Sequence, residues 1–445
     1  MDLCEECNQE WCKPCNSKHF KNNFDKWTSG NETIDKFIRD AQLNADYRWK
    51  VIEWIPYDRF KNIQEIAKGG FSTIYYAKWI DGSIRSWNIN QQWERSYQLE
   101  VVLKKFNNFA NLSEEFLNEI AIHLKSMDFF HSVLMYGITK DPETDKYMIV
   151  LQYMSDGNLR NYLKNNINWD DKLFYLYKLA NNFKDFHRLG IVHQDLHPGN
   201  ILSFDFKNHL FISDFGLSKI VGQNSENSNK RNICGVLPYI APEVLCGEEY
   251  TKAADIYSFG IIAYELITGF APYYDVPHDR DLARKICNGL RPKIPFHTPK
   301  LITRIIMRCW DARVTHRPTF EELEKELLKY YFYYICRDYN KKNKEVKEIT
   351  IQIHNSENFS KNNKSKRKFW RLIRGDSKST STIPHNYRTH PEAIYTSRLL
   401  NYSNLPVPKN EEKFGKELER ITKSVSALSI VASGPIDING NMHLP

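Results

Sequence analysis

Residues that could handle a phosphate group first occur near residue 70. The segment Ile66–Tyr75 reads Ile-Ala-Lys-Gly-Gly-Phe-Ser-Thr-Ile-Tyr and joins two stretches with strand-like patterning. Glycines at such a turn let backbone N–H groups approach the phosphates of a nucleotide. The pattern is imperfect, because Ala67 and Ser72 stand where such a loop usually has glycine. Taken alone, the segment fits an ordinary hairpin turn equally well.

Further motifs follow this turn. Lys104 ends the apolar run Val101–Lys104, and Glu119 lies fifteen residues later within a helical pattern. Any one of the later tripeptides could occur by chance, but all of them in this order and at these separations are not plausibly coincidental. In chain order they are His193-Gln194-Asp195-Leu196-His197-Pro198-Gly199-Asn200, Asp214-Phe215-Gly216, Ala241-Pro242-Glu243, the run that begins at Asp255, and His316-Arg317-Pro318-Thr319.

With these motifs the chain resembles eukaryotic protein kinases over residues 58–330. The pair Cys309-Trp310 is most similar to the tyrosine-kinase-like branch, and the flanks Trp54–Tyr57 and His390–Tyr395 are similar to a large fungal expansion of such kinases. The resemblance implies an α+β, bilobal protein kinase fold with a small β-rich N-lobe and a larger helical C-lobe. It also implies transfer of the γ-phosphate of ATP to Ser/Thr, or Tyr, hydroxyls of protein substrates in intracellular signalling, with Ser/Thr favoured.

The resemblance assigns a role to each matching residue. Asp195 is the expected catalytic base, Lys104 holds phosphates and pairs with Glu119, and Asn200 and Asp214 bind Mg²⁺. Leu151 takes the gatekeeper position. The expected ATP-binding residues are Ile66, Ala67, Gly69, Ile74, Val102, Lys104, Gln152, Met154 and Leu202, and the expected structural residues are Glu243, Asp255 and Arg317, the last paired with Glu243.

Four positions outside the glycine turn also depart from the kinase pattern. Gln194 replaces the arginine that pairs with a phosphate on the activation loop, which predicts weak or no dependence on phosphorylation there. His197 replaces a lysine and Val236 a threonine, which leaves the choice between Ser/Thr and Tyr acceptors unsettled. Val102 replaces alanine in the adenine roof, where overpacking of about 1–3 kcal/mol predicts weaker ATP binding.

Two other functions remain open from the sequence. The altered glycine loop and Val102 suit a pseudokinase scaffold that binds nucleotide or partners without efficient catalysis, although the charged residues are intact. The run Asp195–Asn200 also resembles loops of small-molecule phosphotransferases. Those enzymes lack the peptide-binding activation segment that Glu243, Asp255 and Arg317 build in protein kinases.

The elements that must position these residues are strands first and helices afterwards. Alternating and apolar runs predict a small β-rich part, and helical periodicity dominates from Leu159 onward. A short amphipathic helix is expected within residues 31–44. The expected elements are a hairpin of Phe60–Ala67 and Ser72–Trp79, a polar loop Asp81–Gln98, a strand Leu99–Phe106, a helix Glu114–Ser126 and a strand Tyr147–Tyr153.

Composition separates four regions. Residues 1–20 are a cysteine-rich terminus, 21–57 a short helix and linker, 58–330 the kinase domain, and 331–445 a largely disordered polar tail. The tail contains a basic run with two aromatics, Lys364–Arg374. This run is more typical of a solvated tail than of a membrane or nucleic-acid site.

Four cysteines in the terminus form two Cys-x-x-Cys pairs: Cys4, Cys7, Cys12 and Cys15. Four thiolates are the ligand set of a structural Zn²⁺ site. Only four residues separate the pairs, whereas zinc ribbons usually have about 15–20 there. A zinc knuckle and reduced cysteines in a mobile terminus therefore both remain open.

Bulk properties exclude several classes. The 445 residues carry a net charge of +8, and 41% are apolar, which is compatible with a large core and alone does not imply nucleic-acid binding. Apolar runs are too short to span a membrane, and no signal-peptide or myristoylation pattern is present. We therefore expect a soluble protein, cytoplasmic or nuclear, that acts on protein substrates. Its oligomeric state, substrate and upstream regulator cannot be predicted.

Overall fold

The structure is a computed structural model that describes residue 7 and residues 11–88, 90, 92–107, 114–164, 167–221, 233–335, 348–359 and 389–430. The chain forms two compact bodies. The first contains Met1–Tyr162, Asp185–Val236 and Tyr395–Asn401, and the second contains Leu163–Lys184, Leu237–Ile394 and Tyr402–Pro445. A short segment from near the C-terminus therefore belongs to the same body as the N-terminal strands.

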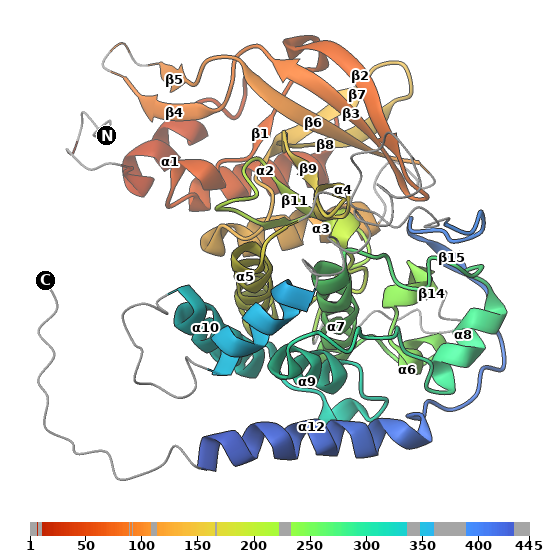
Figure 1. The fold of residues 1–445 in the computed structure, drawn as a ribbon. Helices are drawn as coiled ribbons and strands as arrows, with labels where there is room; N and C mark the ends of the chain where they lie inside the picture. Colours follow the sequence, from red (N-terminus) through yellow and green to blue (C-terminus); the bar gives the residue numbers. More distant parts are fainter. Residues whose placement is uncertain are drawn as a thin grey trace, which may run out of the picture. The chain divides into compact units, whose positions relative to one another are not determined.

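A six-stranded sheet, in the order β1-β7-β8-β6-β3-β2, forms the centre of the first body (Figure 1). Neighbouring strands are antiparallel, except that β1 runs parallel to β7. The predicted hairpin and strands are present, which confirms the β-rich part of the fold. The bounds are β1 (Glu53–Trp54), β2 (Phe60–Lys68), β3 (Ser72–Trp79), β6 (Leu99–Phe106), β7 (Met135–Asp141) and β8 (Lys146–Gln152).

Alternation along β6 separates the two faces of this sheet. Val101 and Leu103 are buried in an apolar cluster on one face. Val102 and Phe106 belong to a second cluster, which also contains residues of the helices α2 and α3. Lys104 falls between Val102 and Phe106 in this alternation, so it lies on the face that the helices cover.

Three helices accompany the sheet: α1 (Lys13–Lys21), α2 (Glu32–Asn44) and α3 (Glu114–Ser126). The side chain of Asn31 caps α2 by accepting from the backbone N–H groups of Thr33 and Ile34. Ile34 and Ile38, four residues apart on one face of α2, are fully buried in the second cluster. The apolar spacing that predicted a helix within residues 31–44 thus corresponds to packing on the sheet.

The expected polar loop Asp81–Gln98 contains a second hairpin instead. Its strands are β4 (Ile84–Trp87) and β5 (Trp93–Arg95). Trp93 stacks on Phe20 at 4.3 Å between ring centroids, and Trp87 stacks on His19 at 4.0 Å. The prediction was wrong because the aromatic partners lie on α1, far away in the sequence, and polar neighbours hid the two tryptophans.

Short elements complete the first body. A three-stranded sheet places β11 between β12 and β9, and two-stranded pairs join β10 with β13 and β14 with β15. The last pair connects positions more than 150 residues apart. The bounds are β9 (Gly157–Asn158), α4 (Leu159–Tyr162), β10 (Ile191–Val192), β11 (Ile201–Ser203), β12 (Phe211–Ile212), β13 (Lys219–Ile220), β14 (Ile233–Gly235) and β15 (Arg398–Leu400).

The second body is helical, as predicted for the later part of the fold. Its central helix α7 (Lys252–Thr268) is buried over nearly its whole length. Among the described residues, no helix is long and apolar enough to cross a membrane. Other helices in its described residues are α5 (Trp169–Arg188), whose last turn belongs to the first body, α6 (Pro242–Leu245), α8 (Arg280–Cys287), α9 (Lys300–Cys309), α10 (Phe320–Ile335) and α12 (Glu412–Ile430).

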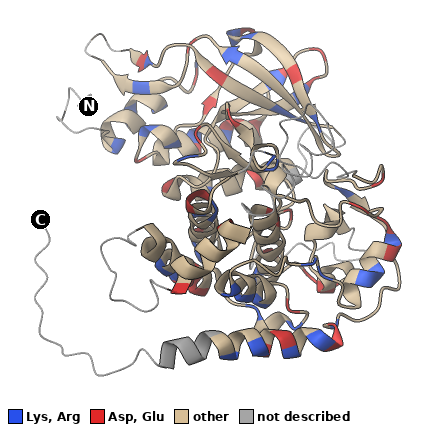
Figure 2. Cartoon of the chain, in the orientation of Figure 1, with Lys and Arg blue, Asp and Glu red and all other residues tan. Residues whose placement is uncertain are grey.

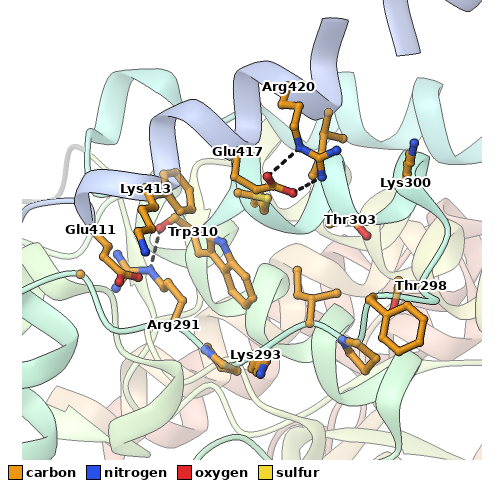
Figure 3. Close-up of a pocket in the computed structure, with 18 residues that line it drawn as sticks. Arg291, Lys293, Thr298, Lys300, Thr303, Trp310, Glu411, Lys413, Glu417 and Arg420 are labelled. Atoms are coloured by element: carbon orange, nitrogen blue, oxygen red, sulfur yellow. Dashed lines mark hydrogen bonds and ion pairs between the residues drawn. The ribbon is translucent and has the colours of Figure 1, made fainter. Parts of the chain in front are cut away.

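Residues 389–430 differ from the largely disordered tail that the composition predicted. Phe414 and Ile421 of α12 are buried. A cavity of about 530 Å³ lies among residues of α9, α12 and the segment 289–298. Figure 3 shows Trp310 and Arg291 together with Glu417 and Arg420 of α12 around it. The opposite charges interspersed along α12 (Figure 2) made this helix look like a solvated segment, although one stripe of it is apolar.

Candidate active site

Lys104, Glu119 and Asp214 form one charge cluster in the first body, in which Lys104 and Glu119 are buried. The Nζ of Lys104 lies 2.5 and 2.7 Å from the two carboxylate oxygens of Glu119 and 2.7 Å from Oδ1 of Asp214. Lys104 is 3% exposed and Glu119 is fully buried. The contact between Lys104 and Glu119 that the resemblance to protein kinases implied is therefore present in the structure, because β6 and α3 pack through the second apolar cluster.

The charges in this cluster shift two pKa values. Burial alone would lower the pKa of Lys104, but the carboxylates of Asp214 and Glu119 raise it above its ordinary value. Burial would raise the pKa of Asp214, but the ammonium of Lys104 lowers it. Lys104 is therefore a cation and Asp214 an anion at neutral pH.

A second group surrounds Asp195. Asn200 donates through Nδ2 to the backbone oxygen of Asp195 at 2.9 Å and to its carboxylate at 3.3 Å. His193 contacts the carbonyl of Ser213 through Nε2 at 3.1 Å, which joins this loop to the segment before Asp214. Asp195 and Asn200 are both buried, so the loop holds a defined geometry.

Two backbone positions in this region are strained. Gln194 has φ of 67° and Asp214 has φ of 62°, although neither is glycine. Such conformations cost about 1–3 kcal/mol each and are concentrated at functional sites. Here they occur at the residue before Asp195 and at the carboxylate that contacts Lys104, which marks both segments as functional candidates.

Phe215 and Gly216 fix the position of Asp214. Phe215 is fully buried and packs edge-on against His123 of α3, with ring centroids 4.9 Å apart. A Cβ on Gly216 would lie 3.2 Å from an oxygen of Glu119. A side chain at this position would require the Glu119 carboxylate to shift by a few tenths of an ångström, so the close approach favours glycine here.

The predicted nucleotide-binding residues divide into two groups. Leu151 and Met154 are buried in the second apolar cluster, and Val102 and Leu202 pack against it partly exposed. Ile66, by contrast, is 50% exposed on β2. The remaining residues lie on the strands or in the turn between them. Ile74 of β3 pairs with Ala67 of β2 and with Lys104 of β6. The backbone N–H of Gly69 donates to the carbonyl of Ser72, and that of Gln152 donates to the carbonyl of Leu134.

The donor set fits a hard divalent cation. Asn200 uses its amide N–H groups on Asp195, so its amide oxygen is the atom suited to a metal ion. Asp214 supplies a carboxylate whose side chain is 42% exposed. Amide and carboxylate oxygens are ligands that Mg²⁺ prefers. Asn200 and Asp214 are therefore the residues whose chemistry suits Mg²⁺.

Comparison with known proteins identifies the family. Residues 60–327 match the model for protein tyrosine and serine/threonine kinases. The chain belongs to this protein kinase family.

Relatives of the kinase are widely distributed. A protein of Acanthamoeba polyphaga mimivirus named as a serine/threonine-protein kinase/receptor is 30% identical over 300 residues, which is 66% of this chain and 17% of that protein. A Dictyostelium discoideum protein named as a serine/threonine-protein kinase is 32% identical over 235 residues, 51% of this chain and 14% of the relative. Human ankyrin repeat and protein kinase domain-containing protein 1 is 30% identical over 277 residues, 59% of this chain and 34% of the relative. The chain therefore spans a minor part of these relatives.

The structural residues of the kinase lie in the second body. Arg317 makes a bidentate contact with Glu243, at 2.6 and 2.8 Å, and its Nε donates to the carbonyl of Asp311. Both charged side chains are buried, as is Asp255 near the start of α7. A buried, bidentate pair of this kind fixes the segment that carries Glu243.

Ser218 is the first of three serines after the Asp214-Phe215-Gly216 motif, with Ser225 and Ser228, that are candidates for phosphorylation on the activation loop. It is 1% exposed, and its hydroxyl donates to the carbonyl of His193 at 2.9 Å. Its hydroxyl thus ties two segments of the kinase together and is not accessible as an acceptor. The other two candidates, Ser225 and Ser228, lie outside the described residues, as do Cys4 and the basic run Lys364–Arg374.

Sequence reasoning missed one contact of the site. The hydroxyl of Ser397 donates to Oδ2 of Asp195 at 2.5 Å, and Nε2 of His197 lies 3.2 Å from the same hydroxyl. Ser397 is 202 residues from Asp195 in the sequence. No local pattern could have pointed to it, because the connection depends on how the tail folds back.

Proposed function

We propose that this chain is an ATP-dependent protein kinase that transfers the γ-phosphate to Ser or Thr hydroxyls of protein substrates in intracellular signalling. The observation that carries the proposal is the contact of Lys104 with both Glu119 and Asp214 in the body that also holds Asp195. A binding scaffold has no need for a buried lysine that two carboxylates keep charged. Such a cluster is the arrangement that phosphoryl transfer requires.

Each charged residue takes one task. Lys104, oriented by Glu119, donates to phosphate oxygens, and Asn200 and Asp214 hold Mg²⁺. Asp195 accepts the proton of the acceptor hydroxyl, and Asn200 keeps its carboxylate in place through the 3.3 Å contact. Bound MgATP supplies the phosphoryl group and the cation that offsets its charge. Val102 and Leu202, with Leu151 and Met154 behind them, provide the apolar surface for the adenine.

Serine and threonine are the proposed acceptors because the relatives named above carry serine/threonine-protein kinase names. The charged residues argue against the pseudokinase alternative, because each of them takes part in a contact within the cluster or the Asp195 loop. We also propose that the kinase belongs to the tyrosine-kinase-like branch and that it acts in the cytoplasm or nucleus. The buried Cys309-Trp310 pair supports the branch.

The test compares the full chain with Asp195→Ala, using labelled ATP, Mg²⁺ and a generic protein substrate. Asp281→Ala is the matched control, because this aspartate is 72% exposed on α8. We expect labelling by the wild type and the control, little by Asp195→Ala, and phosphoserine or phosphothreonine in the product. Equal labelling by all three chains, or phosphotyrosine alone, would contradict the proposal.

A second proposal concerns Zn²⁺ at the N-terminus. The sulfur atoms of Cys7, Cys12 and Cys15 all lie within 4.8 Å of one another. Cys12 caps α1 by accepting from the backbone N–H of Cys15, which lies in the first turn of the helix. Cys4, the expected fourth ligand, lies outside the described residues. Three clustered thiols suit a zinc site better than the mobile terminus that the sequence left open.

Metal content of the full chain tests this site. We expect one Zn²⁺ per wild-type chain and a loss of that zinc in Cys12→Ser. Cys246→Ser is the control, because Cys246 lies outside the cluster. Zinc-free wild-type protein after expression in zinc-replete medium would rule the site out.

A further inference from the structure

A segment of the tail lies against the carboxylate of Asp195, where the hydroxyl of a phosphate acceptor would bind. Tyr395–Asn401 belongs to the first body, and within it the hydroxyl of Ser397 donates to Asp195 at 2.5 Å. Nε2 of His197 lies 3.2 Å from this hydroxyl and 3.7 Å from the Asp195 carboxylate. A serine hydroxyl that donates to the proposed base has the contact that a phosphate acceptor makes before transfer.

His197 has an orientation that suits this contact. The backbone N–H of Gly199 donates to its Nδ1 at 3.0 Å. Nδ1 is therefore an acceptor atom, and Nε2 is the ring atom that can donate to Ser397. Ser397 accepts from His197 while it donates to Asp195, so both functions of the hydroxyl are used and its direction is defined.

A strand pairing sets the register of the segment. β15 (Arg398–Leu400) runs antiparallel to β14 (Ile233–Gly235), with Gly235 opposite Arg398 and Ile233 opposite Leu400. β14 precedes the Ala241-Pro242-Glu243 motif in the sequence. The tail therefore binds by strand addition, in which main-chain hydrogen bonds hold an extended peptide and alternate side chains point inward.

Two further contacts position the segment around Ser397. Arg160 donates to the carbonyl of Tyr395 at 2.7 Å, and its guanidinium lies 5.1 Å from the centre of the Tyr395 ring. A Cβ on Gly70 would lie 2.8 Å from the carbonyl oxygen of Ser397. The glycine turn thus admits this segment only because residue 70 has no side chain. Thr396, next to Ser397, is exposed.

We propose that Ser397 is a phosphorylation site of this kinase and that the chain phosphorylates it intramolecularly. This proposal rests on the proposed function. In the reaction, Ser397 Oγ forms a bond to the γ-phosphorus of a bound nucleoside triphosphate, and its proton passes to Asp195. The bond from that phosphorus to the β–γ bridging oxygen breaks, and the nucleoside diphosphate leaves with the electron pair. The products are phosphoserine at residue 397 and the diphosphate.

The test uses the full chain, first freed of phosphate, then incubated with Mg²⁺ and labelled ATP over a wide range of protein dilution. We expect phosphate on Ser397 by peptide mapping, with a half-time that does not change on dilution. The Ser397→Ala chain should not acquire this phosphate, whereas the Ser397→Thr chain should acquire it at residue 397, because threonine keeps a hydroxyl. Ser403→Ala is the matched control, an exposed serine six residues away that should behave like the wild type.

A mixing experiment separates the two routes of transfer. The wild-type chain is incubated with a tagged Asp195→Ala chain, and only the tagged chain is analysed. Intramolecular transfer predicts that Ser397 of the tagged chain stays unmodified. Phosphate on that serine, or a wild-type rate that rises with protein concentration, would overturn the proposal.

The same reactions contain a generic protein substrate, which distinguishes this proposal from the proposed function. A labelled substrate without phosphate on Ser397 would refute the intramolecular site and leave the kinase activity standing. No labelling of either would refute the proposed function and this inference with it.

Discussion

The ammonium group of Lys104 lies between the two oxygens of the Glu119 carboxylate, at 2.5 and 2.7 Å. These residues come from β6 and α3, which pack through a shared apolar cluster. Since both side chains are buried, removal of either one would leave the other without its ion-pair partner. The pair also directs Lys104 at Asp214, so the contact couples the stability of the first body to the geometry of its site.

Lys104→Met should abolish phosphate transfer and lower the free energy of unfolding by about 3–5 kcal/mol, because it leaves Glu119 buried without its cation. The double variant Lys104→Met/Glu119→Leu should regain most of that stability and none of the activity. Urea denaturation and a phosphate-transfer assay measure both effects. Lys325→Met is the control: this lysine is 70% exposed on α10 and should change stability by less than about 0.5 kcal/mol. Recovery of activity in the double variant would contradict the assigned role of Lys104.

Asp311 predicts a pH dependence for the docking of the tail. Its side chain is 2% exposed and accepts from Asn410 at 2.7 Å and from Arg313 at 2.8 Å. Burial would raise the pKa of Asp311, but its hydrogen bonds to Arg313 and Asn410 lower it below the ordinary 3.8. A lowered pKa means that the contribution of Asp311 to stability is complete above pH 3.8 and is lost as the pH falls through the lower, folded value.

Asp311→Asn should therefore destabilise the chain by about 1.5 kcal/mol at neutral pH, the lower end for hydrogen bonds to a charged group. The difference from the wild type should stay constant from pH 7 to pH 5 and shrink below pH 3.8. Urea midpoints at a series of pH values measure it, with Asp281→Asn as an exposed control. A difference that grew as the pH fell would contradict the sign of this shift.

Substitutions at Gly289 and Gly247 distinguish the cost of backbone strain from the cost of a clash with the tail, because both glycines have a positive φ and only Gly289 lies against the tail. Gly289 has φ of +102°, and a Cβ there would lie 2.5 Å from the backbone nitrogen of Glu411. Gly247 has φ of +97°, and its Cβ would meet nothing within 4 Å. Alanine at either position should cost about 1 kcal/mol in backbone strain. Only Gly289→Ala should add about 1–3 kcal/mol from the clash.

Gly289→Ala should accordingly speed hydrogen exchange in α12 and slow the phosphorylation of Ser397, whereas Gly247→Ala should change neither. Hydrogen exchange and phosphopeptide mapping provide the two readings. Equal behaviour of the two variants would show that the tail does not depend on this contact.

Phosphorylation of the activation loop should change the rate of phosphate transfer little, since Gln194 cannot form a charge-assisted pair with the added phosphate. The variant Ser225→Ala/Ser228→Ala should keep an initial rate within about a factor of two of the wild type. Ser218→Ala should lose activity for a different reason, because its hydroxyl holds the carbonyl of His193. Loss of activity in the double alanine variant would contradict the interpretation of Gln194.

Much of the first body could be predicted because its signals are local. Alternation in Leu99–Phe106 and helical spacing in Glu114–Ser126 gave the bounds of β6 and α3. Lys104 and Glu119 lie on these two elements, and the resemblance to protein kinases implied their pairing. The order of the motifs supplied the family, which the match over residues 60–327 confirms.

What could not be predicted depends on contacts between distant segments. Trp93 becomes part of a hairpin through its stacking on Phe20 of α1. Asn410 contacts Asp311 and Ser397 contacts Asp195, although the intervening sequence is polar and gave no periodic signal. Local composition describes how a segment behaves alone. It does not reveal that a folded surface elsewhere in the chain offers that segment hydrogen bonds.

The most direct measurement of the central claim is the initial rate of phosphate transfer from ATP to a protein substrate by the wild type and by Asp195→Asn. The substitution keeps the shape of the side chain and removes the base. A general base contributes about 10²- to 10⁴-fold to the rate, so we predict a fall of that size, with Asp281→Asn unchanged. A rate in Asp195→Asn equal to that of the wild type would contradict the claim that this site transfers phosphate.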